Sequence, residues 1–336
     1  MKKKVAICTA VLAVLSVLLS SCFNESKADK SLPDFATAGY GIENANEAGW
    51  YEVFTDEFTG DTLNGDIWTT SPHGLRTASN MSGDTAGMNS SYWCPDMVSV
   101  HDGIVEIRAE QRTDHVCSSG ICPSSGIFTG GIETREVLKD GDGKGTGDRL
   151  LFGQAFGYFE TKVKFPNGEG VWSAFWLQSS NQRKLGNAGR DGTEIDIYES
   201  AFVLNPTVMG HALLWNGYGK EGRVKDKKIN VGYDLFDGWH TFALKWTPKY
   251  YVFYIDGVAT WATNGGGVAK VKEFLRLTVE VDQGDKSGPH GQTIGNFNAA
   301  NEYVFSVDYV KVYQNKNYAK YEKEDSYYKG KLSKAN

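Results

Sequence analysis

The stretch GTEIDIYES, residues 192–200, decides how we interpret this chain. Successive side chains of a β-strand point to opposite faces of the sheet, so Glu194 and Asp196 share one face while Ile195 and Ile197 share the other. The two isoleucines therefore predict a strand that packs one side on a hydrophobic core. The two acids predict that the other side is polar.

The last acid of this stretch breaks the alternation. Regular alternation would turn Glu199 into the core beside the isoleucines, where a carboxylate without a partner is costly. One extra residue, a β-bulge near Tyr198, returns Glu199 to the face of Glu194 and Asp196. Crowded acids raise the pKa of at least one carboxyl, which a general acid requires. Taken alone, the motif is explained more simply as the polar outer face of a strand.

Alternation with a period of two dominates the rest of the chain, and outside the N-terminus no long segment has helical spacing. Asp102-Gly103 and Asp256-Gly257 have the composition of hairpin turns. Many short strands and 39 glycines predict an all-β sandwich of two sheets. The alternating segments are 98–109, 158–165, 239–246, 250–255, 258–261, 275–281 and 303–313.

The N-terminus has the pattern of an export signal. Three lysines precede an apolar run of 15 residues, Val5–Leu19, which is too short and wrongly flanked for a membrane span. It ends in Leu-Ser-Ser-Cys, residues 19–22, which resembles the lipobox of bacterial lipoproteins. We expect a lipoprotein signal peptide over 1–21, lipidation of Cys22, a tether over 22–46, and anchoring at the bacterial cell envelope, in the outer membrane. An ordinary signal peptide with an incidental cysteine is the alternative.

The charge and the cysteines limit the possible partners. The formal net charge is −6, and removal of residues 1–21, with three lysines and no acid, leaves −9. So acidic a chain is a poor candidate for binding nucleic acid. Cys94, Cys117 and Cys122 remain after the signal and the lipobox, and an oxidising compartment allows one disulfide among them, with the pairing open. Their spacing, without a histidine cluster nearby, does not suggest zinc.

The segments around the acidic strand form a specific pattern. The strand is preceded by GYFE (157–160) and GEGVWSAFWL (168–177) and followed by HTFALKWTP (240–248), FYIDG (253–257) and VDYVKVY (307–313). In this order, over about residues 50–314, they resemble glycoside hydrolase family 16, which includes laminarinases, licheninases, agarases, porphyranases and carrageenases. The resemblance implies a β-jelly-roll sandwich of two antiparallel sheets with a concave substrate cleft.

Composition divides the chain. No break in composition interrupts residues 47–315, so we expect one domain there, the catalytic domain that the resemblance implies, followed by a Lys- and Tyr-rich tail over 316–336 that we expect to be solvated. Within the domain, the glycine-rich segment 140–148 lacks the final glutamate of an EF-hand, since Leu151 stands at that position. We interpret this segment as a flexible surface loop that borders a cleft.

The resemblance assigns the chemistry to the acidic strand. Glu194 would be the nucleophile of a retaining glycosidase and Glu199 the acid/base, and Asp196 between them would hydrogen-bond the nucleophile. This mechanism needs no cofactor for catalysis. A structural Ca²⁺ is implied by Glu57, the Gly103 carbonyl and Asp308, although three ligands are fewer than the six to eight that calcium prefers.

Several aromatic and polar residues are candidate substrate contacts. Trp172 and Trp176 match family tryptophans near the reacting sugar, and aromatic faces stack well on a pyranose; core packing is the alternative for Trp176. His211 and Trp215 fall where the family has a cleft strand, but Leu214 occupies the position where many laminarinases carry a histidine. The remaining candidates, on segments that could rim the cleft, are Asn89, Trp93, Arg135 and Glu280.

Three functions remain open. The first is a retaining endo-acting hydrolase of mixed-linkage or β-1,3-glucan, acting as a monomer on a β-linked polysaccharide and held at the membrane by its anchor. The second is an endo-β-galactosidase on algal galactan or host O-glycan chains, since some galactan-cleaving members carry an acid near Glu280. The third is a non-catalytic carbohydrate-binding surface lipoprotein, which has no need of crowded carboxylates.

Overall fold

The computed structural model describes residues 49–70, 75–76, 91–116, 118, 122–139, 145–200, 204–281 and 297–323. The predicted signal peptide and tether, with Cys22, lie outside these ranges, as do Asn89 and Cys117. Within the described ranges, no helix has both the length and the apolar character needed to span a membrane.

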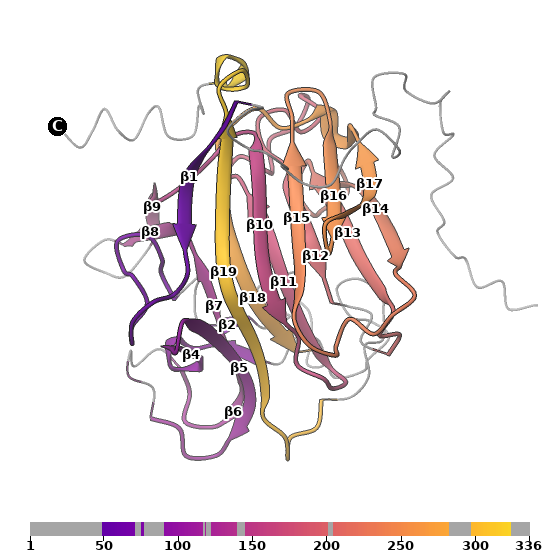
Figure 1. Cartoon of the computed structure of the whole chain (residues 1–336). Helices are drawn as coiled ribbons and strands as arrows, with labels where there is room; N and C mark the ends of the chain where they lie inside the picture. The colour runs from indigo at the N-terminus through magenta and orange to yellow at the C-terminus, as the bar shows by residue number, and fades with distance from the viewer. Residues whose placement is uncertain are drawn as a thin grey trace, which may run out of the picture. The chain divides into compact units, whose positions relative to one another are not determined.

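Two sheets pack face to face and enclose the hydrophobic core (Figure 1). Nearly all neighbouring strands are antiparallel, and the short β3–β6 pair is parallel. The larger sheet has the order β17 (Val258–Thr263), β16 (Tyr251–Ile255), β15 (His240–Trp246), β10 (Gly157–Lys164), β19 (Tyr303–Asn315), β5 (Ile104–Arg112), β6 (Gly126–Thr129), β3 (Ser91–Trp93) and β2 (Leu75–Arg76), with β1 (Trp50–Asp56) paired to β19 and β4 (Val98–His101) to β5.

The smaller sheet carries the acidic strand in its middle. Its order is β14 (Arg223–Asn230), β13 (Val208–Trp215), β12 (Glu194–Glu199), β11 (Val171–Gln178), β18 (Phe274–Val281) and β7 (Gly131–Glu133). A separate hairpin pairs β8 (Arg135–Lys139) with β9 (Gly145–Leu150). Three short 3₁₀ turns complete the described elements: η1 (Pro95–Met97), η2 (Gly265–Gly267) and η3 (Ala319–Tyr321).

The predicted all-β sandwich is confirmed. Every segment predicted from alternation forms strands in the structure, the segment 98–109 as the β4–β5 hairpin, because alternate side chains of each pack on the core between the sheets. The predicted turns also form: Asp102 and Gly103 have φ of 52° and 76°, and Asp256 and Gly257 have φ of 48° and 76°. Positive φ at both central positions is the requirement of a type I′ hairpin turn.

Between the sheets, aromatic side chains surround the inward side of β12. The ring of Tyr198 lies with its centroid 5.3 Å from Phe165, 4.4 Å from Phe242 and 6.5 Å from Phe305. Fully burying an aromatic or aliphatic side chain of this size stabilises the fold by about 1.5–3 kcal/mol. The position of β12, and therefore of its acids, is fixed by this packing.

Segment 140–148 differs from its prediction in part. Residues 145–148 are not a surface loop, because β9 begins at Gly145 and pairs with β8, Asp148 opposite Val137. No apolar alternation marks this strand in the sequence, because the described side chains of β9 are only partly buried or exposed. Residues 140–144 lie outside the described ranges.

The chain after residue 315 continues to contact the domain. The backbone N–H of Lys316 donates to the Gly49 carbonyl at 3.0 Å, and that of Lys323 donates to the Lys270 carbonyl at 2.7 Å. The ring of Tyr318 packs edge-on against Trp50 at a centroid distance of 5.5 Å. Residues 316–323 therefore contact the packed unit, although most of their side chains are exposed.

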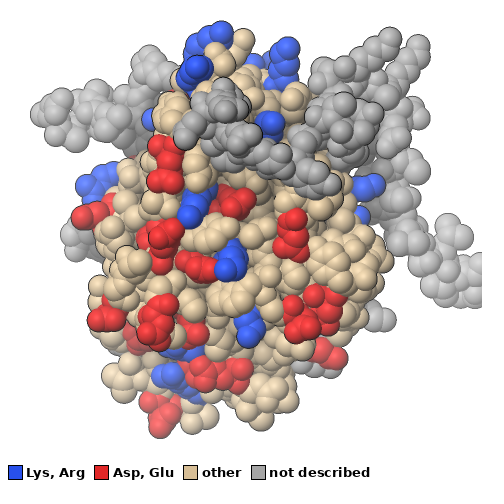
Figure 2. Space-filling model, viewed as in Figure 1, with Lys and Arg blue, Asp and Glu red and all other residues tan. Residues whose placement is uncertain are grey.

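The outer face of the larger sheet carries both signs of charge. Figure 2 shows acidic and basic side chains interspersed over this face, without a continuous basic area among the residues drawn in colour. On β10 and β19 the signs alternate closely enough to pair, as Lys162 Nζ and Asp308 Oδ2 do at 2.6 Å.

Candidate active site

Strand β12 contains the predicted bulge. Between the pairs that Asp196 and Glu199 make with β13, Ile197 and Tyr198 stand opposite the single residue His211. Ile197 and Tyr198 both belong to the buried core, and Glu199 does not. The bulge therefore turns Glu199 back to the face of Asp196, as the sequence predicted, and places the acids of β12 in one row.

The row of acids is crowded and largely removed from water. Glu194 is 8% exposed and Asp196 is 3% exposed. Burial, together with the negative charges of Glu194, Glu280 and Asp226, raises the pKa of Glu199 to about 8. A carboxyl with this pKa is protonated at neutral pH and can donate a proton.

The middle acid, Asp196, is also held in its neutral form. Burial raises its pKa well above the ordinary value, and the charges of Glu199, Glu194 and Glu273 act in the same direction. Its Oδ2 atom has no hydrogen-bond partner among the described residues. Leaving a buried polar atom without a hydrogen bond costs free energy. In its neutral form, Asp196 can avoid this cost by donating a hydrogen bond to a flanking carboxylate.

Glu194 is oriented by two donors from neighbouring elements. Gln178, at the end of β11, donates from Nε2 to Glu194 Oε2 at 2.9 Å, and the hydroxyl of Tyr218 donates to the same oxygen. Gln178 is itself fixed because Arg276 Nη1 donates to its Oε1 at 3.2 Å. Donors to a carboxylate favour its ionised form, which is the form that acts as a nucleophile.

Arg276 connects this network to a buried acid on β7. Its guanidinium is ion-paired with the fully buried Glu133, Nε to Oε2 at 2.9 Å, and lies 3.9 Å from the centre of the Trp176 ring. The Trp176 indole N–H donates to Thr278 Oγ1 at 3.0 Å, and only 6% of the residue is exposed. Trp176 is therefore on the face of the acids, but Arg276 covers its ring where the sequence predicted a stacked sugar.

Two other predicted contacts lie on this face and a third lies beside it. Trp172 and Glu280 are direct partners across β11 and β18, and Glu280 is close enough to act on the pKa of Glu199. Trp93 is buried and donates from its indole N–H to the Val279 carbonyl at 2.9 Å. Trp172 and Glu280 can therefore meet a substrate near the acid/base, whereas Trp93 supports β18.

The structure does not place His211 and Trp215 on the face of the acids. His211 is fully buried on the core side of β13, where its ring lies 4.8 Å from that of Phe253. Its Nδ1 is 2.6 Å from the Ile197 carbonyl and its Nε2 is 2.9 Å from Thr260 Oγ1, and burial lowers its pKa to about 4. Trp215 also packs against the core cluster. Alternation along β13 puts Leu214, which pairs with Glu194, on the face of the acids instead.

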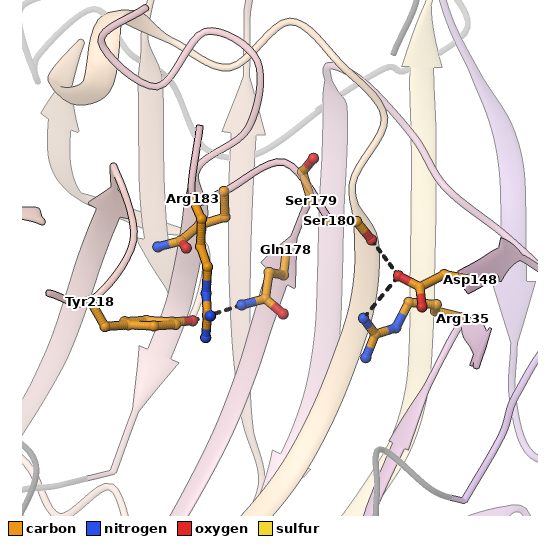
Figure 3. A pocket seen from close by; sticks show the side chains of 8 residues that line it. Arg135, Asp148, Gln178, Ser179, Ser180, Arg183 and Tyr218 are labelled. Atoms are coloured by element: carbon orange, nitrogen blue, oxygen red, sulfur yellow. Dashed lines mark hydrogen bonds and ion pairs between the residues drawn. The ribbon is translucent and has the colours of Figure 1, made fainter. Parts of the chain in front are cut away.

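An open pocket adjoins the Glu194 end of the row (Figure 3). Arg135, a predicted contact, lines it and is held by Asp148, Nη1 to Oδ2 at 3.3 Å, while Ser180 donates to the same carboxylate at 2.6 Å. On the other side, the guanidinium of Arg183 lies 5.7 Å from the centre of the Tyr218 ring. The full lining comprises Arg135, Asp148, Gln178, Ser179, Ser180, Gln182, Arg183 and Tyr218. Such a polar lining suits the hydroxyl groups of a sugar.

The residues predicted for Ca²⁺ do not fit a calcium site. Gly103 lies near the backbone carbonyl of Glu57. The two carboxylates, however, each contact an ammonium group: Glu57 Oε1 is 2.9 Å from Lys311 Nζ, and Asp308 Oδ2 is 2.6 Å from Lys162 Nζ. Because a lysine already neutralises each acid, the described side chains do not gather the oxygen ligands that calcium requires.

Sequence reasoning missed four residues of this site: Glu133, Gln178, Tyr218 and Arg276. Gln178 could have been found, since it follows Trp172 and Trp176 on the same face of an alternating strand. The others are single polar residues in segments without a motif, brought together only by the pairing of distant strands. Arg276, for example, pairs with Glu133 across β18 and β7.

Residues 145–271 match the model of the family described as glycosyl hydrolases family 16. Among curated proteins, the chain is 30% identical over 162 residues to the endo-1,3-1,4-beta-glycanase ExsH of Rhizobium meliloti (strain 1021), a match covering 48% of this chain and 31% of that protein. It is 26% identical over 163 residues to the beta-glucanase of Paenibacillus polymyxa, covering 48% of this chain and 60% of that protein. The match therefore spans less than two thirds of either relative.

The fold also matches solved structures. One belongs to work on endo-acting O-glycanases that prominent members of the human gut microbiota express to initiate mucin breakdown. The TM-score is 0.58 at 18% sequence identity, and the match covers 81% of this chain and 94% of that chain. Identity this low carries information on the fold alone.

Proposed function

Because the chain contains a glycosyl hydrolase family 16 domain, we propose that it is a retaining, endo-acting glycosidase that cleaves a β-linked polysaccharide. Glu194 is the nucleophile and Glu199 the acid/base, and no metal or organic cofactor takes part in bond cleavage. The observation that carries the proposal is the bulge in β12, which sets an oriented carboxylate and a protonated carboxyl on one face of the sheet. This pairing is what double displacement requires.

The steps follow from the environment of each acid. Glu194 attacks the anomeric carbon while Glu199 gives its proton to the leaving glycosidic oxygen, which forms a glycosyl ester and releases the first product. Glu199, now ionised, takes a proton from water, whose oxygen displaces Glu194 from the anomeric carbon. Asp196, neutral and adjacent to both, can donate to Glu194 when that carboxylate leaves.

We propose mixed-linkage or β-1,3-glucan as the substrate, which the similarity to beta-glucanases supports. An endo-β-galactosidase on algal galactan or host O-glycan chains is the second candidate. It is favoured by Glu280, whose carboxylate lies on the face of the acids near Glu199 and can accept hydrogen bonds from sugar hydroxyls.

The test of substrate and mechanism is a panel of purified β-glucans and galactans incubated with the chain. The released oligosaccharides are identified by mass spectrometry, and the anomeric configuration of the newly formed reducing end by proton NMR before mutarotation. The proposal expects internal cleavage of one class of polysaccharide and a β-configured new reducing end. An α-configured new reducing end, or no cleavage across the panel, contradicts it.

The donors to Glu194 provide a finer prediction. Replacement of Tyr218 by phenylalanine removes one of the two hydrogen bonds to Glu194 Oε2, so the carboxylate is less well oriented and less stabilised. We expect kcat to fall roughly 10-fold to 100-fold while KM changes little. Tyr233→Phe is the matched control, because its hydroxyl bonds Asp256 at 2.7 Å and not the acids. Equal kinetics for Tyr218→Phe and the control would contradict the assignment.

We propose further that the chain is a lipoprotein anchored through Cys22 to the bacterial outer membrane, on the strength of the lipobox at residues 19–22. In cells fed labelled palmitate, the chain is expected to carry label and fractionate with membranes. Cys22→Ala should lose the label, whereas Cys8→Ala, within the apolar run, should keep it. Label retained in Cys22→Ala would show that the lipid is elsewhere.

A further inference from the structure

Apart from the acidic row, Cys94, Asp96 and His115 bring three kinds of metal-binding atom together. Cys94 Sγ lies 3.4 Å from His115 Nε2, and Asp96 Oδ2 lies 3.3 Å from the same nitrogen. All three atoms lie within 4.8 Å of one another. Among the described residues, these three side chains form the group of Cys, His and acidic residues whose positions would allow them to hold a metal ion.

The two separations measured from His115 Nε2 fit a tetrahedral zinc ion. Bonds from zinc of about 2.3 Å to sulfur and about 2.0–2.2 Å to nitrogen and oxygen imply ligand-to-ligand distances of roughly 3.4–3.6 Å at tetrahedral angles. The two distances from His115 Nε2 are 3.4 Å and 3.3 Å. Thiolate, imidazole and carboxylate are also the three ligand types that zinc combines in proteins.

The arrangement does not fit a nucleophilic cysteine with a histidine base. In such a relay the thiol contacts one ring nitrogen and the orienting acid contacts the other. Here Cys94 and Asp96 approach the same nitrogen of His115, and Nδ1 faces Arg112 Nη1 at 3.3 Å. Convergence on one point is the geometry of ligands around an ion.

The backbone and a neighbouring serine hold the ligands in place. The N–H of Cys94 donates to the Thr129 carbonyl at 2.7 Å, and that of His115 donates to the Ser124 carbonyl at 2.7 Å. The carboxylate of Asp96 accepts the N–H of Ser118 at 2.9 Å and the hydroxyl of the same residue. Hydrogen bonds to a ligating carboxylate are a regular feature of metal sites.

We propose that Cys94, Asp96 and His115 bind a zinc ion through the thiolate, one carboxylate oxygen and Nε2, with water in the fourth position. Zinc takes the place of the thiol proton on Sγ, which is released to solvent, and of the ring proton on Nε2, which moves to Nδ1. Nδ1 then carries the ring proton, and Arg112 turns from it toward Glu110, to which it is already paired at 2.5 Å. The ion would fasten the loop after β5 to the segment that joins β3 and η1.

The test uses the purified full-length chain, stripped with a chelator and titrated with Zn²⁺ in a calorimeter, and separately with Co²⁺. We expect one equivalent of Zn²⁺ per chain and a thiolate-to-cobalt charge-transfer band, and a higher Tm with the metal. His115→Gln should weaken Zn²⁺ binding more than about 100-fold, beyond the usual 10–100-fold cost of losing a supporting partner. Cys94→Ser should abolish the cobalt band.

His101→Gln is the matched control, because His101 lies on the exposed β4–β5 hairpin beside Glu106; it should bind Zn²⁺ like the unaltered chain. Asp96→Asn keeps the shape of the side chain, so a folded chain with weakened binding is expected there even if His115→Gln fails to fold. Substoichiometric Zn²⁺ on the folded, unaltered chain overturns the proposal. So does undiminished affinity in Asp96→Asn, or a cobalt spectrum without the thiolate band.

Discussion

Replacement of Glu194 by alanine is expected to reduce the rate of polysaccharide cleavage by roughly 10⁴-fold or more, because no other group can form the covalent intermediate. The main alternative nucleophile on the same face, Asp196, is held neutral by burial and by the charges around it. The measurement is the initial rate of reducing-end release. A non-catalytic binding protein would have no rate to lose and would retain its binding to the polysaccharide.

A small anion identifies the role of Glu194 more sharply than the loss of rate. In Glu194→Ala, azide can enter the space that the carboxylate leaves and attack the anomeric carbon as Glu199 protonates the leaving oxygen. One displacement inverts the centre, so the product is an α-glycosyl azide. In Glu199→Ala, azide instead attacks the glycosyl ester on Glu194, and two inversions give the β-glycosyl azide. If both variants gave the same anomer, the two roles would be assigned incorrectly.

The sequence predicted the sandwich and the bulge because both follow from local patterns. Ile195 and Ile197 specify which side of β12 faces the core, and the cost of burying Glu199 requires an extra residue in the strand. The turns at 102–103 and 256–257 follow from the preference of Asp-Gly for positive φ. Such features depend on neighbours in the chain, which a sequence displays directly.

The features that the sequence did not predict depend instead on contacts between residues far apart in the chain. The sequence predicts His211 in the cleft. In the structure, His211 stands opposite the bulge of β12 and its side chain faces the core, which follows from how the two strands pair. Trp176 was on the correct face, but its environment depends on Arg276, a hundred residues away in the chain. Likewise, the cysteine spacing did not predict the cluster of Cys94, Asp96 and His115, because the fold, and not the spacing, brings these side chains together.

The pKa of Glu199 leads to a second prediction with a large expected effect, the loss of activity at alkaline pH. The carboxyl must be protonated to assist departure of the leaving oxygen, and its pKa is about 8. We therefore expect kcat/KM to hold through neutral pH and to fall roughly tenfold per pH unit above about pH 8. Glu199→Gln should lose most activity on polysaccharide but far less on an aryl glycoside, whose leaving group needs no proton. Equal losses on both substrates would argue against an acid role.

The charges around Glu199 should set the pH at which kcat/KM falls, which is the alkaline limb of the pH profile. Glu280 lies near Glu199 and raises its pKa, so Glu280→Gln should shift the limb toward lower pH by roughly 0.5–1 unit. Glu302→Gln is the control, since Glu302 is an exposed acid whose partner is Arg108 at 3.6 Å; the limb should stay in place. A limb that both variants leave unmoved would belong to some other group than Glu199.

Stability gives an independent measure of the same pKa. Glu199 has its pKa raised in the folded chain to about 8 from an ordinary value of 4.5, so the folded state binds a proton that the unfolded state lacks between these values. The stability from this proton is complete below pH 4.5 and is lost as the pH rises through about 8. Glutamine is neutral at every pH. Above pH 8, the free energy of unfolding of Glu199→Gln should therefore exceed that of the unaltered chain by an amount on the order of a few kcal/mol, which is measured as a higher Tm; at pH 4 the difference should be small. The same gain at both pH values would mean that the carboxyl of Glu199 is ionised in the folded protein, and then it could not act as the acid.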